Sequence, residues 1–106
     1  MNLVLTRLAG VMVAKTEIRA DPRGSFTRFF CENDLGAAVA GHHVVQINHS
    51  RTAQRGAIRG LHYQRPPFIE MKLVRCLHGA AWDVVVDLRA GSPTFLEWHA
   101  DRKSVV

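Results

Sequence analysis

Cysteine is scarce in this sequence, and its two cysteines are not arranged to act together. Cys31 and Cys76 lie far apart, and no C-x-x-C pair occurs. A zinc knuckle or a disulfide framework requires closely spaced or numerous cysteines, so the sequence indicates neither of them. We therefore expect a protein of the reducing cytoplasm.

Long apolar runs are also absent. No window approaches the roughly 20 apolar residues that a membrane-spanning helix needs. The opening MNLVLTRLAGVMVAK is interrupted by Arg7, Gly10 and Lys15, so it lacks the ordered regions of a signal peptide. We expect no membrane partner.

Basic residues are plentiful, but they form no cluster. The net charge is +5, and eleven of the 14 basic residues are arginines spread from Arg7 to Arg102. A nucleic-acid module would show a basic run interleaved with aromatic residues, and none occurs. We therefore expect an anionic small ligand, such as a phosphate compound, and no nucleic acid.

What the sequence does contain is short apolar runs separated by glycine and proline turns. Its 106 residues, 47% of them hydrophobic, suit one compact domain over residues 1–106. Most runs alternate with the period of two that is typical of strands, which favours an antiparallel all-β sandwich or barrel. The expected elements are strands at 10–18, around 26–30, at 43–50, 58–64, 71–77 and 81–89, a turn at 21–26, and one short helix at 32–41.

The segment RGLHYQ, residues 59–64, holds the most chemically suggestive side chains. His62 suits a general base because imidazole has an unperturbed pKa near neutral pH, although a lone histidine in a strand is more often structural. Arg59 and His62 are three residues apart, so they would point to opposite faces of a regular strand. Gly60 between them favours a bulge or kink that turns both toward one cavity.

Other polar residues share faces of the expected strands. Lys72 alternates with Val74 and Cys76, which indicates a face that points into a barrel, although a lysine in a strand is usually solvated. Gln46 and Asn48 share one face of the strand expected at 43–50. Gln46 and Asn48 could equally be ordinary polar residues of an edge strand, with no role in binding.

Three segments follow one another over residues 10–98: DPRGSF, QINHSRTAQRGAIRGLHYQRPP and EMKLVRCLHGAAWDVVVDLRAGSPTF. In this order and spacing they resemble the dTDP-4-dehydrorhamnose 3,5-epimerase family. The resemblance implies a cupin-type jelly roll of nucleotide-sugar biosynthesis, acting on a dTDP-linked 4-keto sugar without a metal or organic cofactor. It covers the first part of the family pattern, so we expect the domain to be incomplete at its C-terminus. Because family members exchange N-terminal strands, it also implies a homodimer.

The resemblance gives roles to individual residues. Epimerisation beside a ketone needs a base that removes a C–H proton, a donor that holds the enolate oxygen, and an acid that returns the proton. His62 would be the base, and Lys72 with Arg59 would steady the enolate oxygen and the diphosphate. The positions that match substrate contacts are Arg23, Phe26, Arg28, Gln46, Asn48 and Arg59.

The sequence departs from the family pattern in ways that keep two functions open. Arg28 replaces a glutamate of the best-known members, which leaves the bound nucleotide sugar undetermined. The family's proton-donating tyrosine has no match here, because the sole tyrosine, Tyr63, lies beside His62. The carboxylate that orients the histidine in the family has no match either, and Asp83 is the candidate to replace it. The chain is therefore either an isomerase that inverts C3 and C5, or a catalytically impaired remnant that binds a nucleotide sugar or a full-length paralogue.

Metal binding is common among cupins but is not expected here. Gln64 stands where the second histidine of a paired metal motif would be. Glu70 and His78 remain, but they do not make up a ligand set without that histidine.

Overall fold

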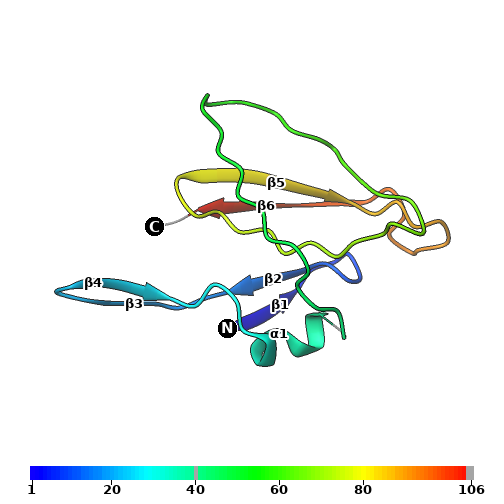
Figure 1. Cartoon of the computed structure of the whole chain (residues 1–106). Helices are drawn as coiled ribbons and strands as arrows, with labels where there is room; N and C mark the ends of the chain where they lie inside the picture. Colours follow the sequence, from blue (N-terminus) through cyan, green and yellow to red (C-terminus); the bar gives the residue numbers. More distant parts are fainter. Residues whose placement is uncertain (40, 105–106) are drawn as a thin grey trace.

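The computed structural model describes residues 1–39 and 41–104, and within them the regular structure is three two-stranded antiparallel sheets and one short helix (Figure 1). The prediction of an all-β chain with at most one short helix is confirmed. In the same residues, no helix has the length and apolar character needed to cross a membrane.

Two hairpins open the chain. Their strands are β1 (Asn2–Leu5), β2 (Met12–Lys15), β3 (Ile18–Asp21) and β4 (Gly24–Thr27). β1 pairs with β2, and β3 pairs with β4 through the turn formed by Pro22 and Arg23. The strand expected at 10–18 is therefore two strands of separate sheets, because the chain leaves the first sheet at Thr16 and Glu17. The strand expected at 26–30 ends at Thr27.

The helix α1 (Glu32–Val39) begins where the sequence predicts. Asp34 in its first turn accepts hydrogen bonds from the Met1 amino group at 3.1 Å and from Arg28 Nη1 at 3.2 Å. These two cations, the amino group first, lower the pKa of Asp34. Ala40 lies outside the described residues, and Gly41 is at φ +82°, a backbone conformation that ends helices.

The longest ladder joins β5 (Ala80–Val86) to β6 (Trp98–Ser104). Asp83 lies opposite Asp101 in this antiparallel register. The strand expected at 81–89 stops at Val86, because Asp87 turns into the loop 87–97. β6 was not predicted from the sequence.

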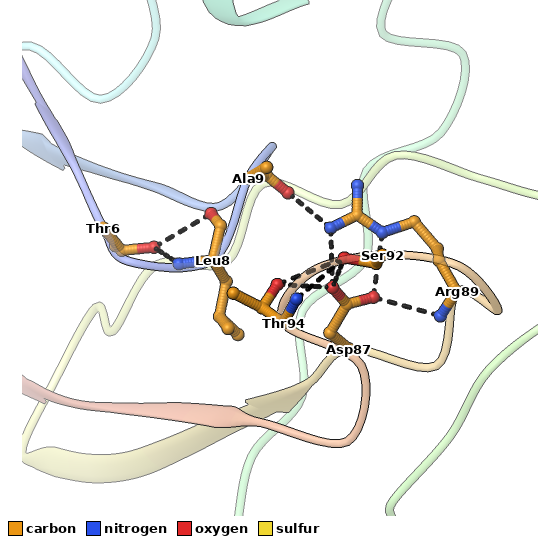
Figure 2. A network of polar contacts seen from close by, with 7 residues as sticks. All are labelled: Thr6, Leu8, Ala9, Asp87, Arg89, Ser92 and Thr94. Atoms are coloured by element: carbon orange, nitrogen blue, oxygen red, sulfur yellow. Dashed lines mark hydrogen bonds and ion pairs between the residues drawn. The ribbon is translucent and has the colours of Figure 1, made fainter.

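The loop 87–97 is organised around the Asp87 carboxylate, whose side chain is 2% exposed. Figure 2 shows this carboxylate surrounded by donors from Arg89, Ser92 and Thr94. Arg89 donates through its backbone N–H at 3.0 Å and through Nε at 2.9 Å, whereas the Ser92 and Thr94 hydroxyls donate at 2.6 and 2.7 Å. Arg89 Nη2 also donates to the Ala9 carbonyl at 2.9 Å, which ties this loop to the turn between β1 and β2.

The Asp87 network makes the stability of the chain sensitive to acid. Arg89 first, and then Ser92, hold the pKa of Asp87 well below its ordinary value of 3.8. Below pH 3.8 the unfolded chain therefore binds a proton that the folded chain does not, so acid favours unfolding. We expect the urea midpoint to fall as the pH is lowered from 5 to 3, and to fall less in Asp87→Asn. An equal fall in both proteins would contradict this explanation.

Residues 42–78 contain no strand, so the strands expected at 43–50, 58–64 and 71–77 are wrong for this structure. Among the described residues, the backbone–backbone hydrogen bonds of this stretch are two turn bonds, His42 N–H to the Val39 carbonyl and Phe68 N–H to the Arg65 carbonyl. Alternation predicts which side chains share a face, but a strand also needs a neighbouring strand to pair with its backbone.

Few apolar side chains are fully buried. Among the described residues, Leu8 in the turn between β1 and β2 and Leu35 in α1 are the buried hydrophobic side chains. The radius of gyration is 15.4 Å, whereas a compact domain of this length has about 13 Å. The chain is therefore more open than a packed sandwich.

Candidate active site

Three of the sequence-predicted site residues line one large cavity. Arg59, His62 and Lys72 all contribute to its wall, and its volume is about 1420 Å³. Much of the remaining wall comes from β2, from the segment 69–77 and from β5 and β6, and Ile18, Ser25 and Thr27 of the β3–β4 hairpin also contribute. The cavity therefore brings together segments that are far apart in the sequence.

Gly60 explains how Arg59 and His62 reach the same cavity. Its φ is +99°, a conformation that L side chains rarely adopt. The backbone is therefore irregular between the two residues, and because residues 58–64 form no strand, alternation does not place Arg59 and His62 on opposite faces. A Cβ added at Gly60 would lie 3.4 Å from the His62 backbone nitrogen, an ordinary contact, so the positive φ rather than a lack of space disfavours another residue here.

Lys72 forms an ion pair with Glu70, two residues earlier in the sequence. Its Nζ lies 2.8 Å from a carboxylate oxygen of Glu70, and both side chains are about half exposed. This ion pair holds the ammonium at the cavity wall. An anionic ligand would have to share the lysine with Glu70.

A second charged group lies on the β5–β6 wall. Lys103 Nζ lies 2.9 Å from Asp101 and 3.6 Å from Asp83, so one cation bridges two carboxylates that face each other across the ladder. Asp83 and Lys103 line the same cavity as His62. Among the described residues, however, no hydrogen bond joins His62 to Asp83. Asp83 pairs with Lys103 instead of orienting His62.

Arg23 and Phe26 lie apart from this cavity, at the β3–β4 hairpin. They border a shallow surface depression of about 260 Å³ together with Arg19 and Asp21. The Arg23 side chain is 90% exposed, and its guanidinium donates to Asp21 at 2.6 and 3.1 Å, which lowers the pKa of Asp21. Within this chain, Arg23 therefore does not line the same cavity as Arg59 and Lys72.

The other predicted substrate contacts lie outside both cavities. Gln46 and Asn48 are exposed in the strandless segment 42–78. Arg28 is occupied by its ion pair with Asp34. These three positions therefore stay predictions that rest on the resemblance.

Arg75 is a cavity residue that the sequence analysis did not select. Its Nη2 donates to the Thr16 hydroxyl at 3.2 Å, and its guanidinium carbon lies 4.2 Å from the centre of the Phe29 ring. No sequence signal showed that Thr16 and Phe29 would meet it. Asp101 and Lys103 were missed because β6 was not predicted.

The described ranges contain no group of three or more histidine, cysteine, aspartate or glutamate side chains that could hold a metal ion. Cys31 and Cys76 are both free thiols and are not paired with each other.

A sequence model of the family described as dTDP-4-dehydrorhamnose 3,5-epimerase matches residues 5–102. The chain belongs to this family. Proteins named dTDP-4-dehydrorhamnose 3,5-epimerase from Pseudomonas aeruginosa and Shigella flexneri are 46% and 42% identical to it. These matches cover 93% and 92% of this chain, but 55% and 54% of the relatives. The chain thus spans about half the length of the relatives it matches.

Solved structures of the family are also similar. The Bacillus anthracis dTDP-4-dehydrorhamnose 3,5-epimerase, crystallised with TDP and PPi bound, has a TM-score of 0.90 and 36% identity over 97% of this chain and 59% of that one. The Elizabethkingia anophelis epimerase has a TM-score of 0.86 and 36% identity over 98% and 57%. The prediction of a partial cupin-type jelly roll is confirmed.

Proposed function

We propose that this chain binds a dTDP-linked 4-keto-6-deoxy sugar and removes the protons at C3 and C5, with His62 as the base. The observation that carries this proposal is that Arg59, His62 and Lys72 line one cavity. The Bacillus anthracis relative is named as an epimerase and holds TDP and PPi, which supports a nucleotide diphosphate as the anionic part of the ligand. No metal or organic cofactor is part of the proposal.

In this mechanism the ketone makes the neighbouring C–H groups weakly acidic. His62 accepts the proton, and the electron pair of the broken C–H bond moves onto the C4 oxygen as an enolate. Lys72 and Arg59 stabilise that negative charge and the diphosphate as positively charged hydrogen-bond donors. Inversion then requires an acid that returns a proton to the opposite face.

Whether the chain is an active epimerase or an impaired remnant depends on two groups: an acid that returns the proton and a carboxylate that orients His62. Among the described residues, no carboxylate is hydrogen-bonded to His62, so its tautomer and pose are not fixed as in a catalytic triad. The 106-residue chain is therefore proposed to remove protons faster than it inverts carbon centres. The second proposed function is an impaired remnant that binds a nucleotide sugar or a full-length paralogue.

A homodimer would give the β3–β4 hairpin a role. Figure 1 shows this hairpin projecting away from the rest of the chain. Because Arg23 at its tip is largely exposed, a second copy could receive it, and Phe26 with it, at the edge of its own cavity. We propose a homodimer in which residues 1–106 of each copy form one partial domain. The expected location is the cytoplasm.

The ligand assignment is tested by titrating dTDP into Arg59→Gln. Losing one charge-assisted contact to a phosphate should raise the Kd roughly 10- to 100-fold. The matched control is Arg65→Gln, because Arg65 is exposed, lies outside both cavities and contacts Tyr63. An unchanged Kd in Arg59→Gln would remove Arg59 from the site.

A further inference from the structure

Arg75 lies three residues after Lys72 and contacts two distant parts of the chain. Its Nη2 donates to the hydroxyl of Thr16, a residue between β2 and β3, and its guanidinium lies over the ring of Phe29, a residue between β4 and α1. All four side chains line the same cavity. One side chain of the segment 69–77 therefore joins that segment to two connections of the N-terminal half.

The bond from Arg75 to Thr16 is the long-range hydrogen bond of its stretch. Among the described residues 44–78, the other hydrogen bonds reach no further than three positions along the chain. The ion pair of Lys72 is equally local, because Glu70 lies two residues away. Glu70 moves together with Lys72, so it does not fix the lysine relative to the rest of the cavity wall. Arg75 supplies that tie.

The contacts of Arg75 depend on its planar guanidinium. A guanidinium presents a face to an aromatic ring and a donor at its edge at the same time, which a lysine ammonium cannot do. The Nε of Arg75 is buried, and a contact between a cation and a ring is stronger where water is excluded. Three residues of extended chain span at most about 11 Å, so Lys72 follows any shift of this anchor.

We propose that Arg75 is a positioning residue that acts through Lys72. By holding the segment 69–77 against Thr16 and Phe29, it sets where the Lys72 ammonium meets an anionic ligand, and it does not contact the ligand itself. The proposal rests on the proposed function in one respect, the role of Lys72 as a ligand contact. Misplacing such a group by about 1 Å can cost roughly 10²-fold in rate, so a residue outside the chemistry can control it.

The first test follows Lys72 without any ligand. The chain has three lysines, so ¹³C-methylated lysine side chains give NMR signals that can be assigned by substitution. In Arg75→Gln the Lys72 signal should move and narrow as its segment loosens, whereas the Lys103 signal should stay in place, because its partners are carboxylates of β5 and β6. The matched control Arg65→Gln should leave both signals unchanged. An unmoved Lys72 signal in Arg75→Gln would overturn the proposal.

The second test is a double-substitution cycle with dTDP as the ligand. Arg75→Gln should raise the Kd roughly 3- to 100-fold in the unchanged chain but less than about twofold in a Lys72→Met chain, because residues that act through each other are not additive. Arg75→Lys should not restore the affinity, since it keeps the charge but not the planar group. Equal effects in both backgrounds, or full restoration by lysine, would mean that Arg75 acts on the ligand through its own charge, and would overturn the proposal.

Two controls separate folding and ligand binding from positioning. If amide exchange throughout β5 and β6 shows that Arg75→Gln does not fold, Thr16→Val takes its place. This variant removes only the hydroxyl that accepts from Arg75, so the Lys72 signal should make a smaller shift in the same direction, and no shift would again overturn the proposal. If the unchanged chain binds no dTDP, the proposed function fails, whereas the Lys72 signal still decides whether Arg75 positions that lysine.

Discussion

The His62→Asn variant is expected to exchange solvent deuterium into C3 and C5 of a dTDP-4-keto-6-deoxy sugar about 10²–10⁴ times more slowly than the unchanged chain. Asparagine keeps a polar side chain but cannot accept a proton near neutral pH. The measurement is mass spectrometry of the recovered sugar nucleotide in D₂O. His49→Asn is the matched control, because His49 is exposed and does not line the cavity. Equal rates in both variants would remove His62 as the base.

The same experiment separates proton removal from inversion. The chain should take up deuterium while forming little inverted sugar, because loss of the residue that orients a catalytic histidine costs about 10⁴-fold in rate. Robust inversion by the 106-residue chain would refute this, and an acid would then be sought among Tyr63, Cys76 and Asp83. The absence of both exchange and inversion, with dTDP still bound, would favour the impaired remnant.

The second large effect is expected at Asp87, which does not itself line the cavity. Asp87→Ala removes the acceptor of five hydrogen bonds from Arg89, Ser92 and Thr94. It also leaves the Arg89 guanidinium without its anion. We expect amide exchange at Arg89 and Leu96 to become roughly 10- to 100-fold faster, because hydrogen bonds to charged groups are strong and their loss opens the loop locally.

The chain contains its own control for this prediction. Asp21 and Arg23 form the same Asp-x-Arg arrangement, with a backbone bond of 2.8 Å, on an exposed hairpin. Asp21→Ala should change amide exchange in β3 and β4 by less than about fivefold, because exposed ion pairs contribute little. Similar effects of the two substitutions would mean that burial of Asp87 is not what makes its network important.

Local patterns predicted the local elements well. The one short helix expected at 32–41 is α1 at Glu32–Val39, and the expected turn holds Pro22 and Arg23 between β3 and β4. The alternation of 81–86 became β5. The same signal failed at 43–50, where the residues alternate equally well. A strand is stabilised by hydrogen bonds to another strand, and alternation within one segment does not reveal whether that neighbour exists.

In the candidate site, too, local features followed from the sequence, whereas contacts between distant segments did not. Gly60 was expected to make the backbone irregular and it has a positive φ, but the strand expected around it at 58–64 is absent. Nothing in the sequence near Asp83 predicted its ion pair with Lys103, because that contact depends on the register of β5 against β6. Arg23 matches the family motif, yet its hairpin directs it away from the cavity of this chain.

By itself, the sequence determined the family, the all-β class and the identity of the proposed base, because these depend on residue types in a fixed order along the chain. The tertiary structure alone decided which side chains share a cavity: Arg59, His62 and Lys72 do, whereas Arg23 does not. It also decided that Asp87 is buried among donors and that Asp83 pairs with Lys103. The physical reason is that burial and charge pairing depend on distances through space, and strand pairing and turns set those distances.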